Sequence, residues 1–117
     1  MAATATRVST ITYSGDVVGT QTLSAASNAA SPAHVQVVTL ASGFNQIDKP
    51  TGGTTPVSVT IVPPTGNTTS ITLKGVTGDT GIRIHNTDPT TVAFDSSVSS
   101  IGLTAASTVT GVRLFWT

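Results

Sequence analysis

Four side chains that could take part in chemistry lie close together in residues 73–85: Lys74, Asp79, Arg83 and His85. Asp and His are common general acids and bases, and Lys and Arg can stabilise developing negative charge. Only 9% of the chain is charged, so such a concentration raises the question of an active site. The alternative is a turn between two strands, because several glycines lie among these residues.

The triplet Asp79-Thr80-Gly81 is the sharpest of these candidates. Retroviral-type aspartic proteases, which are dimers of small β-rich chains, carry Asp-Thr-Gly on a buried turn where two carboxylates share one proton. That geometry needs an apolar strand before the turn, but residues 75–78 are Gly-Val-Thr-Gly, a loop composition. We therefore expect Asp79 to shape a β-turn by accepting main-chain hydrogen bonds, with Gly81 supplying freedom in φ. An aspartic protease is the alternative.

The histidines and aspartates lack the spacing of a metal site. No His-x-His or His-x-x-x-His pair occurs, so His34 and His85 are not expected to share a metal. Asp88 could pair with His85 across a turn, although Pro89 marks that segment as a connection. We predict no catalytic residue, no metal ligand and no cofactor. One calcium site built in a loop from two of the aspartates stays open.

The composition predicts one domain built from strands. A length of 117 residues suits a single domain, and the absence of Cys removes disulfides and thiolate metal sites. The chain has no Glu, and Thr and Ser fill most polar positions. Thr suits a pleated surface, whereas helix surfaces use Glu, Lys, Gln and Arg.

Charge and hydropathy narrow the classes of partner. The five basic residues are scattered and balanced by five acidic ones, so nucleic-acid binding is not expected. Apolar runs are far shorter than the ~20 residues of a membrane-spanning helix, and residues 1–7 show no secretory signal. Charged residues usually make up about a quarter of a chain, and near-zero net charge favours association. We therefore expect neighbouring molecules to cover much of this surface.

Alternation of apolar and polar residues predicts a series of strands. In residues 56–62, Val59 and Ile61 fall on one face, and Ser58 and Thr60 on the other. Comparable runs, each bounded by Gly, Asp, Asn or Pro, occupy residues 33–40, 68–73, 81–85, 91–94, 100–104 and 111–116. Strands that start roughly every ten residues are typical of sandwiches and barrels.

Two of these runs, residues 56–62 and 68–73, are expected to form a hairpin. Pro63-Pro64 ends the first strand, and residues 65–67 supply turn chemistry. A second expectation concerns the run that contains the charged cluster. There Ile82 and Ile84 should face the core, with Arg83 and His85 facing outward.

The N-terminal third has a weaker pattern. Residues 7–13 and 20–23 permit strands, and residues 24–32 favour a loop over a helix because Ser and Asn compete for main-chain hydrogen bonds. We predict an all-β fold, a single antiparallel β-sandwich of about eight strands with a jelly-roll or Ig-like topology. Residues 1–117 form one domain, with the core in residues 33–117. Residues 1–32 form an extended arm or loosely packed strands.

The last strand indicates a surface for protein contact. Phe115 and Trp116 must point to opposite faces, and Trp116 shares its face with Val112 and Leu114. Phe115 is then the outward aromatic, beside Arg113. The predicted interface residues, which all face outward, are Arg83, His85, Arg113 and Phe115.

Three stretches of sequence resemble small β-sandwich virion proteins of tailed bacteriophages, of the decoration or tail and baseplate accessory type. They are residues 57–67 (VSVTIVPPTGN), residues 71–82 (ITLKGVTGDTGI) and residues 112–116 (VRLFW). The resemblance covers about the last seventy residues and includes no catalytic motif. It implies a non-enzymatic structural protein located in the virion.

The expected function is therefore a structural one. The protein would form homo-oligomers and bind other virion proteins of the capsid or tail, with no nucleic acid and no membrane as partners. Exposed strand edges are a liability in a monomer but become interfaces when copies pair. The alternative is a carbohydrate-binding or adhesive β-sandwich module that binds sugars on an exposed aromatic side chain.

Overall fold

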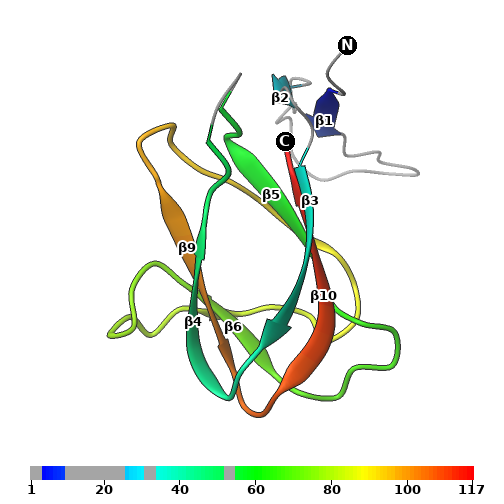
Figure 1. The fold of residues 1–117 in the computed structure, drawn as a ribbon, viewed down its shortest axis with the longest axis vertical. Coiled ribbons are helices and arrows are strands. Elements are labelled where there is room, and N and C mark those ends of the chain that lie inside the picture. Colours follow the sequence, from blue (N-terminus) through cyan, green and yellow to red (C-terminus); the bar gives the residue numbers. More distant parts are fainter. Residues whose placement is uncertain (1–3, 10–25, 31–33, 52–54) are drawn as a thin grey trace, which may run out of the picture.

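The computed structural model describes residues 4–9, 26–30, 34–51 and 55–117, and the secondary structure in these ranges is entirely β. The strands are β1 (Ala5–Ser9), β2 (Ala26–Ala30), β3 (His34–Leu40), β4 (Gly43–Asp48), β5 (Ser58–Val62), β6 (Ile71–Lys74), β7 (Ile82–Arg83), β8 (Thr90–Ala93), β9 (Ser100–Ala105) and β10 (Val109–Trp116). Eight of them form two antiparallel four-stranded sheets, and β1 pairs with β2 (Figure 1). The expected all-β sandwich is confirmed.

The order of strands within the sheets is that of a jelly roll. The first sheet has the order β3-β10-β5-β8, and the second has the order β4-β9-β6-β7. When the strands are counted from β3, the first sheet contains the first, eighth, third and sixth strands. The second sheet contains the second, seventh, fourth and fifth. Successive strands therefore alternate between the sheets along most of the chain, as in double Greek-key jelly rolls. Of the two predicted topologies, the jelly roll is the one observed.

The core lies between the sheets, where the predicted alternation places apolar side chains. Its fully buried members include Val59 and Ile61 of β5, Leu103 of β9, and Leu114 and Trp116 of β10. The two edges of this interior are less complete, because Val92 of β8 and Leu73 of β6 are only partly buried against it. Each fully buried side chain of this size contributes about 1.5–3 kcal/mol to folding.

The expected hairpin between residues 56–62 and 68–73 is wrong. β5 pairs with β10 and β8 in the first sheet, whereas β6 pairs with β9 and β7 in the second. Pro63-Pro64 does end β5, and a turn follows in which the Asn67 N–H donates to the Pro64 carbonyl (3.1 Å). That connection carries the chain across the sandwich instead of folding it back. Alternation identifies a strand and its inner face, but it does not identify the partner strand.

Two side chains differ from the prediction in their exposure. Ser58, expected outside, lies on the outer face but is completely buried there by Arg7 and Thr117. Ile82 was expected inside, and it is 72% exposed, although Ile84 is buried as predicted. The reason is that β7 has only two residues and is an edge strand, so no further strand covers Ile82.

The N-terminal segments contain a strand that the sequence did not predict. Residues 26–30, expected to be a loop, form β2, and β2 pairs with β1 from Ala5↔Ala30 to Ser9↔Ala26. The pairing partner, and not the local composition, makes this segment extended. The strands permitted at residues 10–13 and 20–23 lie outside the described residues. Whether residues 1–32 act as an arm stays a prediction.

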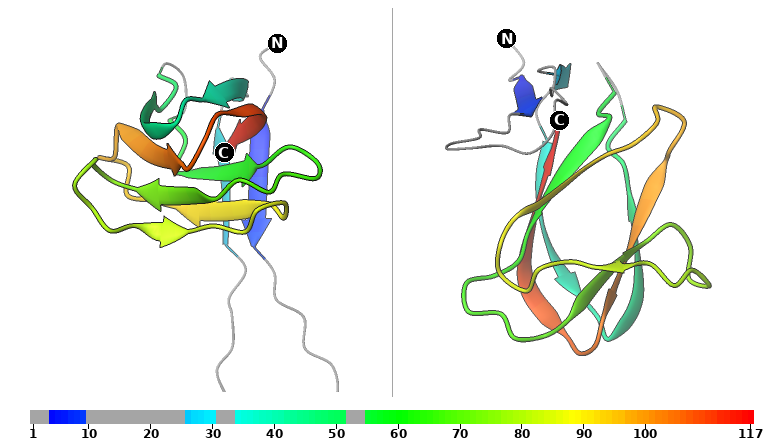
Figure 2. Two further views of the ribbon diagram at one scale, coloured as in Figure 1. Left: turned by 90° about the horizontal axis from the view of Figure 1, so that it is seen from below. Right: turned by 180° about the vertical axis from the view of Figure 1, so that it is seen from behind.

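Three connections lie at the lower end of the sandwich in Figure 1 and in the right view of Figure 2, namely residues 41–42, 63–70 and 106–108. The connection of residues 84–89 is joined to residues 63–70 by a hydrogen bond from Asn67. Ala106 N–H donates to the Ser70 carbonyl (3.1 Å), and Ser42 Oγ donates to the Ala106 carbonyl (3.4 Å). These bonds join loops that are far apart in sequence, so this end of the molecule is a connected polar surface.

Candidate functional site

Asp79 lies on the exposed turn between β6 and β7. Its Oδ2 accepts hydrogen bonds from the main-chain N–H groups of Gly75 (3.0 Å) and Val76 (2.9 Å), and its own N–H donates to the Val76 carbonyl (3.1 Å). Gly81 has φ of +74°, and a Cβ there would lie 2.5 Å from the Leu73 carbonyl oxygen. The predicted role of Asp79 in shaping the turn is confirmed. The carboxylate is exposed and is held by the main chain of its own loop.

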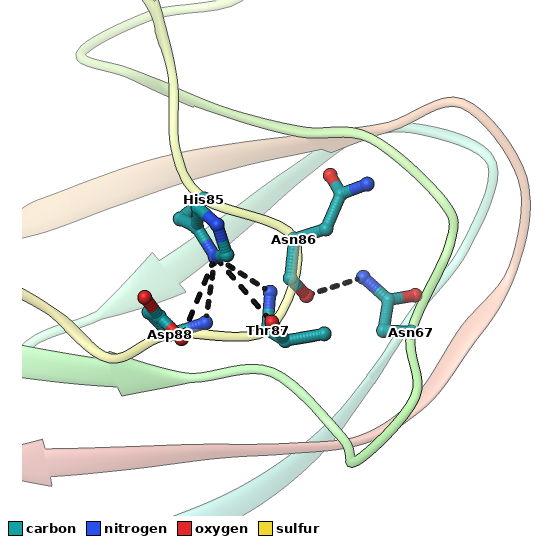
Figure 3. Close-up of polar contacts among 5 residues, drawn as sticks. All are labelled: Asn67, His85, Asn86, Thr87 and Asp88. Carbon is teal, nitrogen blue, oxygen red and sulfur yellow. Dashed lines mark hydrogen bonds and ion pairs between the residues drawn. The ribbon is translucent and has the colours of Figure 1, made fainter.

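His85 has a similar structural task in the connection between β7 and β8. Its Nδ1 accepts hydrogen bonds from the main-chain N–H groups of Asp88 (2.9 Å) and Thr87 (3.2 Å), as Figure 3 shows. The Asp88 carboxylate lies 3.8 Å from the same nitrogen, in an exposed position. Both main-chain N–H groups converge on this one ring nitrogen. The ring therefore organises a turn.

Asn67 ties this turn to the connection between β5 and β6. Its Nδ2 donates to the Asn86 carbonyl (2.9 Å), as Figure 3 shows. The same Nδ2 donates to the Thr69 carbonyl (2.9 Å), and Oδ1 accepts from the Thr69 N–H (3.2 Å). An open hollow of about 650 Å³ lies beside it, and Arg83 and His85 are among its lining residues. The amide thereby joins two connections, each of which crosses from one sheet to the other.

Lys49 is a polar residue whose position the sequence did not indicate. It is buried at the end of β4, where its Nζ donates to the Ser96 carbonyl (3.0 Å) and lies 5.5 Å from the centre of the Phe94 ring. Its N–H donates to the Ser99 carbonyl (2.8 Å). The aliphatic stem and charge thereby attach the end of β4 to the loop between β8 and β9. Nothing in the local sequence distinguishes Lys49 from a solvated lysine.

Another polar cluster lies on the outer face of the first sheet, at the end of β5 and β10. Ser58 Oγ accepts a hydrogen bond from Arg7 Nε (2.8 Å) and bonds to Thr117 Oγ1 (2.6 Å). Nearby, the buried His34 Nε2 has no hydrogen-bond partner among the residues that the structure describes. His34 lies in β3 and His85 in the β7–β8 connection. Within the described part of the chain, no three His, Asp, Glu or Cys side chains come together as metal ligands.

An apolar groove of about 460 Å³ opens between the edge strands β7 and β8. Its walls come from both sheets, with Leu73 and Ile82 on one side and Val92 and Phe94 on the other. Seen from below, β7 and β8 lie on the same side of the molecule (Figure 2, left). Lys74 and Asp79 contribute to the lining. Ile82 is therefore exposed because the interior of the sandwich opens at this edge.

The outer face of the first sheet is a second apolar surface. Val35 and Val37 of β3 are 60% and 70% exposed. Phe115 of β10 is half-buried and pairs with Val35, and Arg113 pairs with both Val37 and Val62. The Arg113 guanidinium lies 5.7 Å from the centre of the Phe115 ring. We call these five residues the outer valine face. Single exposed apolar residues are common, but a contiguous group indicates a contact surface.

The four predicted interface residues do not form one surface. Arg83 and His85 lie on and beside β7 of the second sheet, whereas Arg113 and Phe115 lie on β10 of the first. All four face outward as predicted, although Phe115 is partly covered. The predicted interface residues did not include the exposed Val35 and Val37. In residues 33–40, a period of two puts them together on the face opposite Val38 and Leu40. Apolar residues on both faces of one strand are the signal that could have identified them.

No protein-family model, curated protein or solved structure matches this chain. The described residues contain no helix with the length and hydropathy needed to cross a membrane.

Proposed function

We propose that this chain is a non-enzymatic structural protein of a bacteriophage virion, a capsid decoration or tail-associated protein. It forms homo-oligomers and binds other virion proteins, and neither nucleic acid nor a membrane is among its partners. The observation that carries the proposal is the outer valine face, where Val35 and Val37 are 60% and 70% exposed in a chain with only 9% charged residues. Such a surface favours association over solvation.

The fold is compatible with this function. Jelly rolls of eight strands occur in viral capsid proteins and also in lectins, so the fold supports a virion role only by analogy. The sequence resemblance to phage decoration and tail proteins favours the first of these classes. In addition, the bonded loops at one end of the sandwich give a fixed surface, which suits a permanent contact.

The side chains that could do chemistry support a structural role. Asp79 and His85 are occupied in shaping turns, and Lys49 is buried against Phe94. Two of the basic residues are likewise engaged within the fold, since Lys49 bonds Ser96 and Arg7 bonds Ser58. The five basic residues are scattered and balanced by five acidic ones, so they offer phosphates no basic patch.

The proposal is tested by measuring mass and particle binding. The purified chain should have a light-scattering mass that is a multiple of 11.7 kDa, and it should sediment with phage particles that lack their own copies of it. The control variant Val76→Lys changes an exposed loop valine that is remote in sequence from the outer valine face. It should keep the mass and the particle binding of the parent. Monomeric mass together with no affinity for any capsid or tail component would refute the proposed function.

A further inference from the structure

The strand β3 is the least protected edge of the sandwich. Natural edge strands are shortened, charged or interrupted by Pro, which prevents pairing with other chains. Among the four edge strands of the two sheets, β7 has two residues, β8 has four and follows Pro89, and β4 ends in Asp48. By contrast, β3 has seven residues, HVQVVTL, without Pro and without Asp, Glu, Lys or Arg. Within the described residues it pairs only with β10.

The hydrogen-bond ladder shows which main-chain groups of β3 face away from the sheet. Ser58 and Thr117 exchange two hydrogen bonds (2.8 and 2.9 Å), so they form a hydrogen-bonded pair between β5 and the end of β10. In an antiparallel sheet such pairs alternate along each strand. Phe115 and Arg113 therefore direct their main-chain groups toward β5. Leu114 and Trp116 direct theirs toward β3.

The same alternation continues into β3. Leu114 pairs with Gln36, and Trp116 pairs with His34, so these two β3 residues use their main-chain groups on β10. The groups of Val35, Val37 and Thr39 then point to the free edge. These are the residues whose side chains are exposed, at 60% for Val35 and 70% for Val37. The free edge and the outer valine face are thus presented by the same residues.

This edge is complementary to itself. If two copies of β3 run antiparallel about a twofold axis through Val37, the free N–H and C=O groups of Val37 meet those of Val37 of the partner subunit. In that register, Val35 pairs with Thr39 of the partner subunit. The main-chain groups of Val35, Val37 and Thr39 that point to the free edge then all form hydrogen bonds. A register centred on Gln36 or Val38 would leave the groups of Thr39 or Val35 unpaired within the strand. A twofold contact that uses the same patch on both subunits closes by itself.

We propose that two copies of this chain associate through β3, with Val37 on the twofold axis, and that their first sheets join into one continuous sheet. The exposed valines of both copies then lie next to one another on one face of that sheet. The occupant is a second copy, because the pattern of free groups on β3 matches its own antiparallel image. This inference rests on the self-association in the proposed function and specifies its geometry.

Cysteine cross-linking tests the register, since the chain has no Cys of its own. The Cα atoms of a hydrogen-bonded antiparallel pair lie about 5.5 Å apart, within the range for a disulfide. Val37→Cys should form a covalent dimer under mild oxidation, at least about tenfold faster than Val35→Cys, whose symmetry mate is four residues away along the paired strands. Val76→Cys, at an exposed loop valine, measures random collision.

A second variant tests the same contact without cysteine. Val37→Pro removes an N–H that makes no ladder bond to the described residues, so the variant should keep the parent melting temperature within a few degrees and should become monomeric. Gln36→Pro is the matched control, because it removes a bond to β10 and should melt well below the parent.

The possible outcomes separate the two proposals. An oligomeric parent in which Val37→Cys cross-links no faster than Val35→Cys, or in which Val37→Pro keeps its mass, would overturn the β3 contact and leave self-association standing. A monomeric parent would overturn both the contact and the self-association.

Discussion

Between the two sheets, Val59, Ile61 and Leu114 are completely buried, whereas Asp79, His85 and Asp95 are exposed in the turns and bond to the main chain of their own loops. The interior brings together residues from distant parts of the sequence. Each of these turn residues organises neighbours two to four positions away. Asp79 and His85, whose residue types suggested an active site in the sequence, thus bond to the main chain of near neighbours in the sequence.

This difference between the interior and the turns predicts which substitutions lower the free energy of unfolding most. Burying an unpaired charge between the sheets costs several kcal/mol, a large part of the 5–15 kcal/mol by which a domain is typically stable. Removing one exposed hydrogen bond costs only about 0.5–1.5 kcal/mol. Substitutions in the interior should therefore unfold the protein, and substitutions in the turns should shift its stability slightly.

The largest effect is expected for Ile61→Asp. The carboxylate would lie at a completely buried position in β5, without a partner. We expect a protein that is unfolded at 25 °C or loses several kcal/mol of unfolding free energy in chemical denaturation. Thr110→Asp, at an exposed position of β10, is the control and should unfold near the parent. Equal stability of the two variants would mean that Ile61 does not face the interior.

A smaller effect is expected where tight packing occurs outside the interior. The Gly102 position in β9 is covered by Phe44, and a Cβ there would clash with the Phe44 ring. Gly102→Ala should cost about 1–3 kcal/mol, because the ring must move. In a Phe44→Ala background, the same substitution should cost much less, which a double-mutant cycle measures. If the two substitutions had additive effects on the free energy of unfolding, Gly102 and Phe44 would not be in contact. Tight packing would then be limited to the interior.

Much of the strand pattern could be predicted from the sequence, since burial on one face of a pleated strand imposes a period of two. Val59, Ile61, Leu114 and Trp116 lie where that period places them. The pairing could not be predicted, because alternation in β5 and β6 is the same whether they form a hairpin or lie in different sheets. The exposure of Ile82 likewise follows from the edge position of β7 in the described part of the chain, which local alternation does not indicate.

The candidate contact surface was predictable only in part. Arg113 and Phe115 were identified from the alternation in β10, but they pair with Val35 and Val37 through the sheet, and that register is not in the local sequence. The buried positions of Ser58 and Lys49 likewise depend on Thr117 and Phe94, which lie far along the chain. Long-range contacts of this kind require the three-dimensional structure.

A modest effect is expected for the turn at Asp79. Asp79→Ala removes the acceptor of two main-chain hydrogen bonds and should cost about 0.5–1.5 kcal/mol in chemical denaturation. Asp79→Asn keeps one acceptor oxygen at the same place, so it should cost less than the alanine variant. If Asp79→Asn were as damaging as Ile61→Asp, the ranking of interior above turns would be wrong.

The smallest expected effect is the dependence of stability on acidic pH through Asp95. The pKa of Asp95 is lowered from its ordinary value of 3.8, first by a hydrogen bond to the Ser97 side chain and then by the Ser97 N–H, which lies 2.9 Å from Oδ1. Desolvation opposes these bonds, and the charge of Lys49 adds to them. Because the folded pKa is below the unfolded one, the stabilisation is complete above the unfolded pKa. It is lost as the pH falls through the folded pKa.

Melting curves of the parent and Asp95→Asn, recorded from about pH 6 to about pH 2, test this sign. The parent should melt slightly higher at pH 6, and the difference should close as the solution becomes more acidic than pH 3.8. Ser97→Ala removes the first cause of the lowered pKa, so in its background the difference should be smaller and should depend less on pH. A difference that widens in acid would mean that folding raises the pKa of Asp95, and the turn would then disfavour the charge it holds.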